Sequence, residues 1–352
     1  MTQSAQQGSP PGISTATARL REGAEVAARL AGRGWAALAE QFGQLRGHFA
    51  LLRSPLTLLP APPVLCAAVL LYARGATPAW GPVVLTLVSG TLALMGVGAL
   101  PMRRQATPEA LREAWRPQAR GRVKPMSASD RYATRLGSAL LALAVVCAAP
   151  LAFASRGAMW LLVGFALVVL LFYSANGVRP LLTPIDEVIA ALCLGPGMVA
   201  LTALAQRATM TPRDWLIAVA FGCMALGVLG GRRLSESPKE AALRGRTLGA
   251  RIGLRRALQV AGGAMALGFA LVVALAVTPP TLPGALLALT AFPMALVALS
   301  GLGASRYAPS RQLAAAQLMR AYVWFGLALT AGIAATLIVQ GFIGAFVHSL
   351  IG

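Results

Sequence analysis

The sequence predicts an all-α membrane protein with about nine transmembrane helices in a bundle and a cytoplasmic N-terminus. Three observations lead to this prediction. The chain of 352 residues is 57% hydrophobic and only 12% charged, about half the charge of an average soluble protein. Apolar runs close to the roughly 18–20 residues that cross hydrocarbon recur along it. The alternation of apolar and polar residues that a membrane β-barrel requires is absent.

The apolar runs are rich in Ala, Leu, Gly and Val, and several begin near a proline, which suits helices that pack on one another in lipid. The four cysteines fall in four different runs without paired spacing, which indicates apolar packing rather than a disulfide or a metal site. The predicted spans are Leu56–Tyr72, Ala79–Leu100, Gly137–Ala154, Met159–Asn176, Pro184–Ala205, Trp215–Gly230, Leu258–Val277, Leu282–Gly303 and Ala321–Ser349.

The net charge of +20 is unevenly divided between the two sides of the predicted bundle. With a cytoplasmic N-terminus, 27 of the 31 Lys and Arg residues fall on cytoplasmic segments. The other side keeps Arg74, Arg156, Arg207 and Arg213. This asymmetry follows the positive-inside rule, so the basic composition predicts a lipid bilayer as the partner and no nucleic acid.

Three regions follow from the same pattern. Residues 1–13 are rich in Ser, Gln, Gly and Pro, a composition typical of a disordered tail. Residues 14–52 are amphipathic, so we expect helices that lie at the membrane surface. Residues 53–352 contain all the predicted spans and form the transmembrane domain.

Two predicted cytoplasmic loops, 101–136 and 231–257, are long and basic, and each contains an Arg-Gly-Arg triplet. Glu236 and Glu240 lie in the second loop at positions i and i+4, which share one face of a helix. Two such carboxylates suit Mg²⁺ bound together with phosphate oxygens, and arginines suit the phosphates themselves. A diphosphate on a long lipid would satisfy both features. In the alternative interpretation the two glutamates only neutralise neighbouring arginines on a solvated helix.

The same segment, RRLSESPKEAALRGRTLGARIG, resembles the second acidic motif of the UbiA superfamily of intramembrane prenyltransferases. When the two are aligned on Arg246, Thr247 and Leu248, the two family aspartates fall on Glu236 and Glu240. The resemblance covers most of the chain from about residue 45 and implies the nine-helix fold of that family.

A second segment, YSANGVRPLLTPIDEVIAALCLGP, resembles the branch of that superfamily that prenylates 1,4-dihydroxy-2-naphthoate in menaquinone biosynthesis. Tyr173, Glu187, Gly195 and Pro196 fall at the spacing of that branch without a gap. RSPLTLLPAPPVL is similar to the entry into its first helix, and RPQARGRVKP is similar to the end of the loop after its second helix.

The first acidic motif of the family is degenerate in this sequence. Its acidic positions fall on Leu100, Arg103 and Thr107, and Glu109 and Glu113 lie nearby but out of register. An arginine at a ligand position could bind diphosphate directly, but it cannot hold a metal. The resemblance therefore leaves open whether the protein is an enzyme.

The resemblance implies a role for each matching residue. Glu236 and Glu240 would bind Mg²⁺ on an isoprenyl diphosphate, and Tyr173 and Glu187 would face the aromatic acceptor in a central cavity, where Glu187 would polarise a phenolic proton or orient the acceptor. The arginines that would clamp the diphosphate are Arg112, Arg116, Arg122 and Arg246. Alternatively, Tyr173 is an interfacial tyrosine and Glu187 a carboxylate favoured at the start of a helix.

Three functions are compatible with these observations. The first is transfer of a prenyl group from an isoprenyl diphosphate to a small aromatic acceptor, at the inner (plasma) membrane with the site facing the cytoplasm. The second is a UbiA-like protein that has lost catalysis and binds an isoprenoid lipid or a partner without turnover. The third is a small membrane transporter or scaffold. The sequence does not define the prenyl chain length, the acceptor, the oligomeric state or the role of residues 14–52.

Overall fold

The computed structural model describes residues 58–75, 79–99, 128–155, 160, 164, 185–235, 253–278, 282–304 and 308–351. All of them belong to the unit Arg53–Gly352. Their regular structure is entirely helical, without a strand in the ranges described. This confirms the all-α class. The predicted tail and surface helices of residues 1–52 lie outside the described residues.

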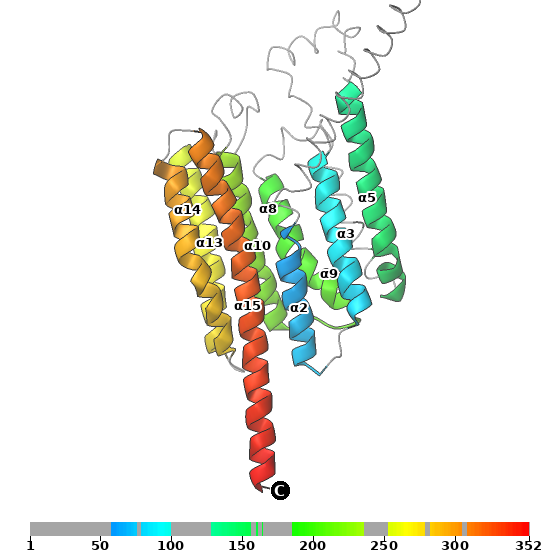
Figure 1. The fold of residues 1–352 in the computed structure, drawn as a ribbon, viewed down its shortest axis with the longest axis vertical. Helices are drawn as coiled ribbons and strands as arrows, with labels where there is room; N and C mark the ends of the chain where they lie inside the picture. The colour runs from blue at the N-terminus through cyan, green and yellow to red at the C-terminus, as the bar shows by residue number, and fades with distance from the viewer. Residues whose placement is uncertain are drawn as a thin grey trace, which may run out of the picture. The chain divides into compact units, whose positions relative to one another are not determined.

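The helices follow the predicted apolar runs (Figure 1). Each predicted span overlaps a described helix except Met159–Asn176, of which only residues 160 and 164 are described. The elements in chain order are α2 (Ala61–Ala73), α3 (Trp80–Ala99), α5 (Ala128–Ala154), α8 (Ile185–Leu192), the π-helical turn η3 (Cys193–Gly197), α9 (Met198–Ala205), α10 (Pro212–Leu234), α13 (Leu254–Val277), the 3₁₀ helix η4 (Pro283–Ala291), α14 (Phe292–Ala304) and α15 (Ala308–Ile351).

Six helical segments in the described part of the chain are long and apolar enough to cross a membrane. Two shorter apolar helices, Ala61–Ala73 and Trp80–Gly96, lie beside them. A chain with these properties belongs to the multi-pass membrane proteins. The total of about nine spans and the side on which the N-terminus lies remain predictions.

The last helix begins earlier than the hydrophobic pattern predicts. The last predicted span is Ala321–Ser349, whereas α15 is helical from Ala308 and includes Arg311 and Arg320. One face of this segment, which includes Ala315 and Leu318, is buried in the bundle. The two arginines within the helix do not interrupt it, because a long side chain can extend from a helix to water.

Helix α10 is the centre of the bundle, and glycines on its surface allow its neighbours to approach closely. A Cβ atom on Gly222 would meet Pro196 of η3 at 3.0 Å. A Cβ on Gly227 would overlap Met265 of α13, and one on Gly231 would overlap Leu318 of α15. Small residues at such contacts are typical of helix packing in membranes, because van der Waals contact replaces the hydrophobic effect there.

Aromatic side chains fill the core where α10, α13 and α15 meet. Phe221 of α10 lies edge-to-face with Phe325 of α15, with ring centroids 5.6 Å apart, and Phe325 lies edge-to-face with Phe269 of α13 at 5.5 Å. Tyr322 joins the cluster and donates a hydrogen bond from its hydroxyl to the carbonyl of Leu59 at 3.3 Å. This contact ties the start of α2 to α15.

A sequence such as Gly195-Pro196-Gly197 can kink a membrane helix and open space in a bundle. In the structure these residues form the π-helical turn η3, which joins α8 to α9 without a break. A Cβ atom on Gly195 would overlap the backbone of Gly222. The turn therefore lets α10 approach at Gly195, and α10 fills the space on that side.

The helix ends form two groups, one at each end of the bundle. At one end the turn between α2 and α3 contacts the turn between α9 and α10. There the Gln206 side chain accepts a hydrogen bond from the Ala79 amide at 2.9 Å and donates one to the Ala79 carbonyl at 2.8 Å. We call this the turn end. At the other end, which we call the loop end, α3, α10 and α14 finish and α5, α8, α13 and α15 begin (Figure 1).

Candidate functional site

The structure describes two buried carboxylates, Glu187 with 4% and Asp214 with 4% of the residue exposed. Ionisable groups inside membrane helices are costly, so each requires a structural or a functional explanation. Glu187 lies in the first turn of α8, at the loop end, and Asp214 lies in the first turn of α10, at the turn end. The two carboxylates therefore occupy opposite ends of the bundle.

Asp214 has a complete structural explanation. Its carboxylate accepts a hydrogen bond from the Thr211 amide at 2.7 Å. In return, the Thr211 hydroxyl oxygen accepts a hydrogen bond from the Asp214 amide at 3.5 Å. This reciprocal pair is a capping box, with Pro212 in the first helical position. The sequence Thr-Pro-Arg-Asp carries the pattern, so the cap was readable from the sequence alone.

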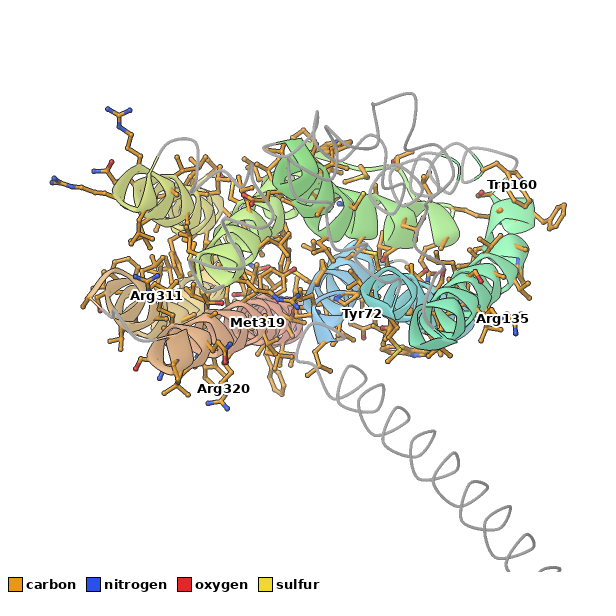
Figure 2. All side chains as sticks on the ribbon, turned by 90° about the horizontal axis from the view of Figure 1, so that it is seen from above. Tyr72, Arg135, Trp160, Arg311, Met319 and Arg320 are labelled. Carbon is orange, nitrogen blue, oxygen red and sulfur yellow. The ribbon has the colours of Figure 1, made fainter. Side chains whose placement is uncertain are left out.

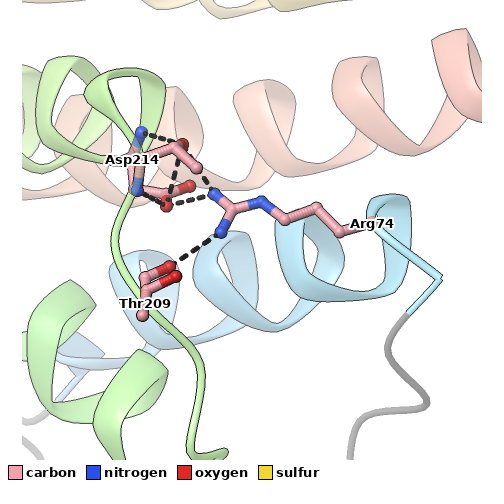
Figure 3. Close-up of polar contacts among 4 residues, drawn as sticks. Arg74, Thr209 and Asp214 are labelled. Atoms are coloured by element: carbon pink, nitrogen blue, oxygen red, sulfur yellow. Dashed lines mark hydrogen bonds and ion pairs between the residues drawn. The ribbon is translucent and has the colours of Figure 1, made fainter.

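Arg74 completes this cluster from the end of α2 (Figure 3). Its guanidinium donates to the Thr209 carbonyl at 3.0 Å and to the Thr211 hydroxyl at 2.8 Å, and it forms an ion pair with Asp214. Arg74 thus bonds three groups around the start of α10 and fixes the turn end. Nothing in this arrangement requires a ligand.

Glu187 lies where α8, α10 and α13 meet. A Cβ atom on Gly230 would stand 3.8 Å from the Glu187 carboxylate oxygen Oε2 and 3.6 Å from the Cβ of Ala261. Gly230 therefore leaves room for the carboxylate between α10 and α13. This contact between Glu187 and Gly230 lies near the C-terminal end of α10. In the sequence, the segment with Glu236 and Glu240 follows directly after α10.

The residue before that segment is also ordered by the bundle. Ser235 is buried, and its hydroxyl donates a hydrogen bond to the Arg232 carbonyl at 2.6 Å. This bond and the backbone bond from the Ser235 amide to Gly231 satisfy the last turn of α10. Ser235, the last residue described before Glu236, is thus held at the loop end.

Arginines of four helices surround the loop end. Figure 2 shows Arg135 on one side of the view and Arg311 and Arg320 on the other. The arginines of this end whose side chains are described are Arg135 of α5, Arg232 of α10, Arg255 and Arg256 of α13, and Arg311 and Arg320 of α15. An anionic headgroup approaching the membrane at this end meets a positive field.

Most of the predicted site lies outside the described residues. Of the residues assigned from the resemblance, the structure places Glu187 only. The others are Tyr173, Arg112, Arg116, Arg122, Arg246, Glu236 and Glu240, together with Glu109 and Glu113 near the degenerate motif. Within the residues that are described, no three His, Cys, Asp or Glu side chains gather in a way that could hold a metal ion.

Sequence reasoning missed the contribution of Gly230. The Gly230-Gly231 pair at the end of an apolar run was a visible signal, because glycine inside a membrane helix often marks close approach of another group. Which group approaches depends on the packing of α8 on α10, and periodicity does not reveal that packing.

No protein-family model matches this chain, and no curated protein matches it. The fold defines the chain as a helical multi-pass membrane protein, with a buried carboxylate at each end of the bundle in the part that the structure describes. The UbiA superfamily is proposed from the sequence motifs alone.

Proposed function

We propose that the protein is a UbiA-type intramembrane prenyltransferase, which transfers a prenyl group from an isoprenyl diphosphate to a small aromatic acceptor. We place it in the inner (plasma) membrane with its loop end toward the cytoplasm. The observation that carries the proposal is the position of Glu187, buried against Gly230 at the loop end. The Tyr-Ser…Glu…Gly-Pro resemblance assigns the acceptor site to this same residue.

The charge around the loop end supports binding of a diphosphate there. Arg232, Arg255 and Arg256 flank the segment with Glu236 and Glu240 in sequence. Arginine binds phosphate oxygens in bidentate geometry, while the apolar bundle below accommodates a hydrocarbon tail. Arg112, Arg116, Arg122 and Arg246 are the proposed clamp on the diphosphate.

The donor set of Glu236 and Glu240 suits Mg²⁺, because carboxylates together with substrate phosphates are its usual protein ligands. When bound, the metal would supply charge neutralisation for the leaving diphosphate. The bond between C1 of the prenyl group and the diphosphate oxygen breaks, and the diphosphate leaves with the electron pair. A ring carbon of the acceptor bonds to C1 and then loses its proton.

Glu187 has the proposed role of orienting the acceptor. A carboxylate within hydrogen-bond reach of a phenolic hydroxyl withdraws its proton and raises electron density on the ring, which favours attack on the allylic carbon. Tyr173 would lie on the other side of the same acceptor. The roles of Glu187 and Tyr173 both come from the resemblance, and the burial of Glu187 supports the role proposed for it.

A second function is favoured by one specific observation, the degenerate first motif with Arg103 at a ligand position. With that metal site incomplete, the protein would bind an isoprenyl diphosphate through its arginines and release it unchanged. The two functions differ in turnover and agree in binding, so a single set of assays separates them.

The test uses the full chain in lipid nanodiscs with Mg²⁺, a panel of isoprenyl diphosphates and a panel of aromatic acids. The proposal predicts a prenylated product from the wild type and none from Glu240→Ala. Glu40→Gln, a change in the N-terminal region, is the matched control and keeps activity. Binding of the diphosphate without product supports the second function. Absence of binding to any diphosphate in the panel contradicts both.

A further inference from the structure

Helix α15 is much longer than the membrane it crosses. It has 44 residues, which at 1.5 Å per residue is about 66 Å. The hydrocarbon core of a bilayer is about 30 Å thick, and about 40–45 Å with its headgroup regions. The neighbouring helices α10 and α13 have 23 and 24 residues, a length that matches the bilayer. The excess of α15 must therefore lie outside the layer that the bundle spans.

The contacts of α15 show where it leaves the bundle. The Gly284 amide of η4 donates a hydrogen bond to the Thr336 hydroxyl at 2.9 Å, and Gly332 lies directly against Gly284. Of the residues of α15 whose burial is described, which end at Ile343, Thr336 is the last that is buried, and every residue from Ile338 to Ile343 is exposed. Figure 1 shows this part of α15 extending past the ends of the other helices.

Aromatic residues mark the membrane–water interface at this end. Tyr72 in the last turn of α2, Trp80 at the start of α3 and Trp215 in the first turn of α10 all lie at the turn end, and all three are exposed. Tyr and Trp collect at the level of the lipid headgroups, where the ion pair of Arg74 and Asp214 also lies. The part of α15 after Thr336 begins at this level.

The part of α15 after Thr336, which we call the protruding segment, is apolar over residues 338–343 instead of polar. Its large side chains Ile338, Val339, Phe342 and Ile343 are 64%, 56%, 76% and 58% exposed. At 100° per residue these four fall on one side of the helix, and Gln340 and Gly341 fall on the other. The sequence after Arg320 contains no Asp, Glu, Lys or Arg up to its last residue. Such a helix face is covered by lipid or by protein, not by water.

Two observations favour lipid over a second copy of the chain. In the part of α15 that packs on the bundle, Trp324 and Leu327 form an exposed apolar stripe on the outer face of the helix. The same stripe continues onto Ile338 and Phe342. A stable protein interface uses about 20–30 residues from each side, whereas four large apolar side chains are exposed over residues 338–343, the part of this segment whose side chains the structure describes. Over these residues the apolar face is thus continuous with the lipid-facing surface and small for a dimer.

We propose that the segment of α15 from Leu337 onward is a membrane-surface anchor, which bends away from the bundle after Thr336 and lies in the headgroup region of the leaflet at the turn end. The Thr336 hydroxyl donates a hydrogen bond to the Gly332 carbonyl of the preceding turn at 3.0 Å. A threonine that bonds the carbonyl four residues before it favours a bend in the helix at that point. Phe342 and Ile343 then insert between lipids.

The test places an environment-sensitive fluorophore on single cysteines of the full chain, with the four native cysteines replaced by alanine. The nanodiscs contain phosphatidylcholine and phosphatidylglycerol, with a nitroxide quencher attached near the headgroup or near the end of the acyl chain. Phe342→Cys is the test position. Leu327→Cys, on the lipid-facing stripe inside the bundle, and Gln340→Cys, on the opposite face of the same segment, are the matched references.

If the segment is a surface anchor, the fluorophore at Phe342→Cys emits at shorter wavelength than in water. The quencher near the headgroup removes most of its intensity, and the quencher near the end of the acyl chain removes little. At Leu327→Cys the deep quencher removes more intensity than the headgroup quencher, and Gln340→Cys is quenched less than Phe342→Cys. Water-like emission at Phe342→Cys without quenching overturns the proposal. Blue-shifted emission without quenching, together with disulfide crosslinks between two Phe342→Cys chains, also overturns it and assigns the segment to a second copy. None of these outcomes depends on prenyl transfer.

Discussion

The carboxylate of Glu187 and the α-carbon of Gly230 face each other across the contact between α8 and α10. A Cβ atom on Gly230 would lie 3.8 Å from Glu187 Oε2 and 3.6 Å from Ala261, which is ordinary van der Waals contact. Gly230 thus leaves space for a methyl group and for little more. The pair sits at the loop end, where the chain continues to Glu236 and Glu240.

This geometry predicts different outcomes for the same substitution at two glycines of α10. Gly230→Ala fits the available space and gains helix propensity, so the free energy of unfolding stays equal or rises by up to about 1 kcal/mol. Gly227→Ala overlaps Met265 and approaches the Ala261 carbonyl at 2.9 Å, so it destabilises by about 1–3 kcal/mol. Reversible unfolding in detergent micelles measures both. Equal effects of the two changes would contradict the packing described for α10.

A larger side chain at Gly230 tests the proposed site directly. Gly230→Leu fills the space beside Glu187 and displaces its carboxylate, so prenyl transfer falls by about 10²–10⁴-fold, the usual contribution of a positioned acid–base group. Glu187→Gln removes the charge without changing the volume and has an effect of the same order. We expect both variants to retain diphosphate binding, because the proposed diphosphate site is formed by the arginines, Glu236 and Glu240 and does not include Glu187. Full turnover in Glu187→Gln would remove this residue from the reaction.

The cluster at the turn end predicts a purely structural effect. Arg74→Ala leaves Asp214 buried without its ion-pair partner, and Asp214→Asn weakens both the ion pair and the capping box. Each change lowers the free energy of unfolding by about 1–3 kcal/mol, and the double variant loses less than the sum of the two. Arg207→Ala, an exposed arginine in the same turn, is the control. Loss of diphosphate binding in Arg74→Ala at unchanged stability would contradict the structural role.

The contact between η4 and α15 predicts strict dependence on glycine. A Cβ atom on Gly332 would overlap the Gly284 backbone, so Gly332→Ala must separate the two helices and expose Thr336. We expect this variant to unfold during purification or to lose more than about 3 kcal/mol of stability. Gly341→Ala makes the same change in the same helix where nothing lies within 4 Å, and it keeps wild-type stability. Monodisperse, heat-resistant Gly332→Ala protein would show that the contact is unimportant.

The apolar runs predicted the all-α class and most helix positions correctly, because hydrocarbon length and backbone hydrogen bonding leave helices as the simplest solution. The start of α15 was predicted too late, because Arg311 and Arg320 were counted as loop residues although the face with Leu318 is buried. The pattern also could not show that α15 leaves the bundle after Thr336, because an apolar helix has the same sequence inside and beyond a bundle.

For the candidate site, the sequence singled out Glu187 as a carboxylate near a helix start, and the structure places it buried in the first turn of α8. Its neighbour Gly230 was not predicted, because the contact joins segments far apart in the chain. The capping box of Thr211 and Asp214 has a local pattern and could have been predicted, whereas the partner Arg74 is 140 residues away from Asp214. Local chemistry is readable from sequence, and the choice of distant partner is set by packing.

The most direct test of the account locates the diphosphate headgroup on the full-length protein. A radiolabelled isoprenyl diphosphate analogue with a photoreactive group near its diphosphate is crosslinked in nanodiscs with Mg²⁺, and the labelled peptides are identified by mass spectrometry. The account predicts labelling at the loop end, on the end of α10 near Ser235 or the start of α8 near Glu187, and loss of the label with excess unlabelled diphosphate. Labelling at the turn end around Arg74, or no competable label anywhere, would contradict it.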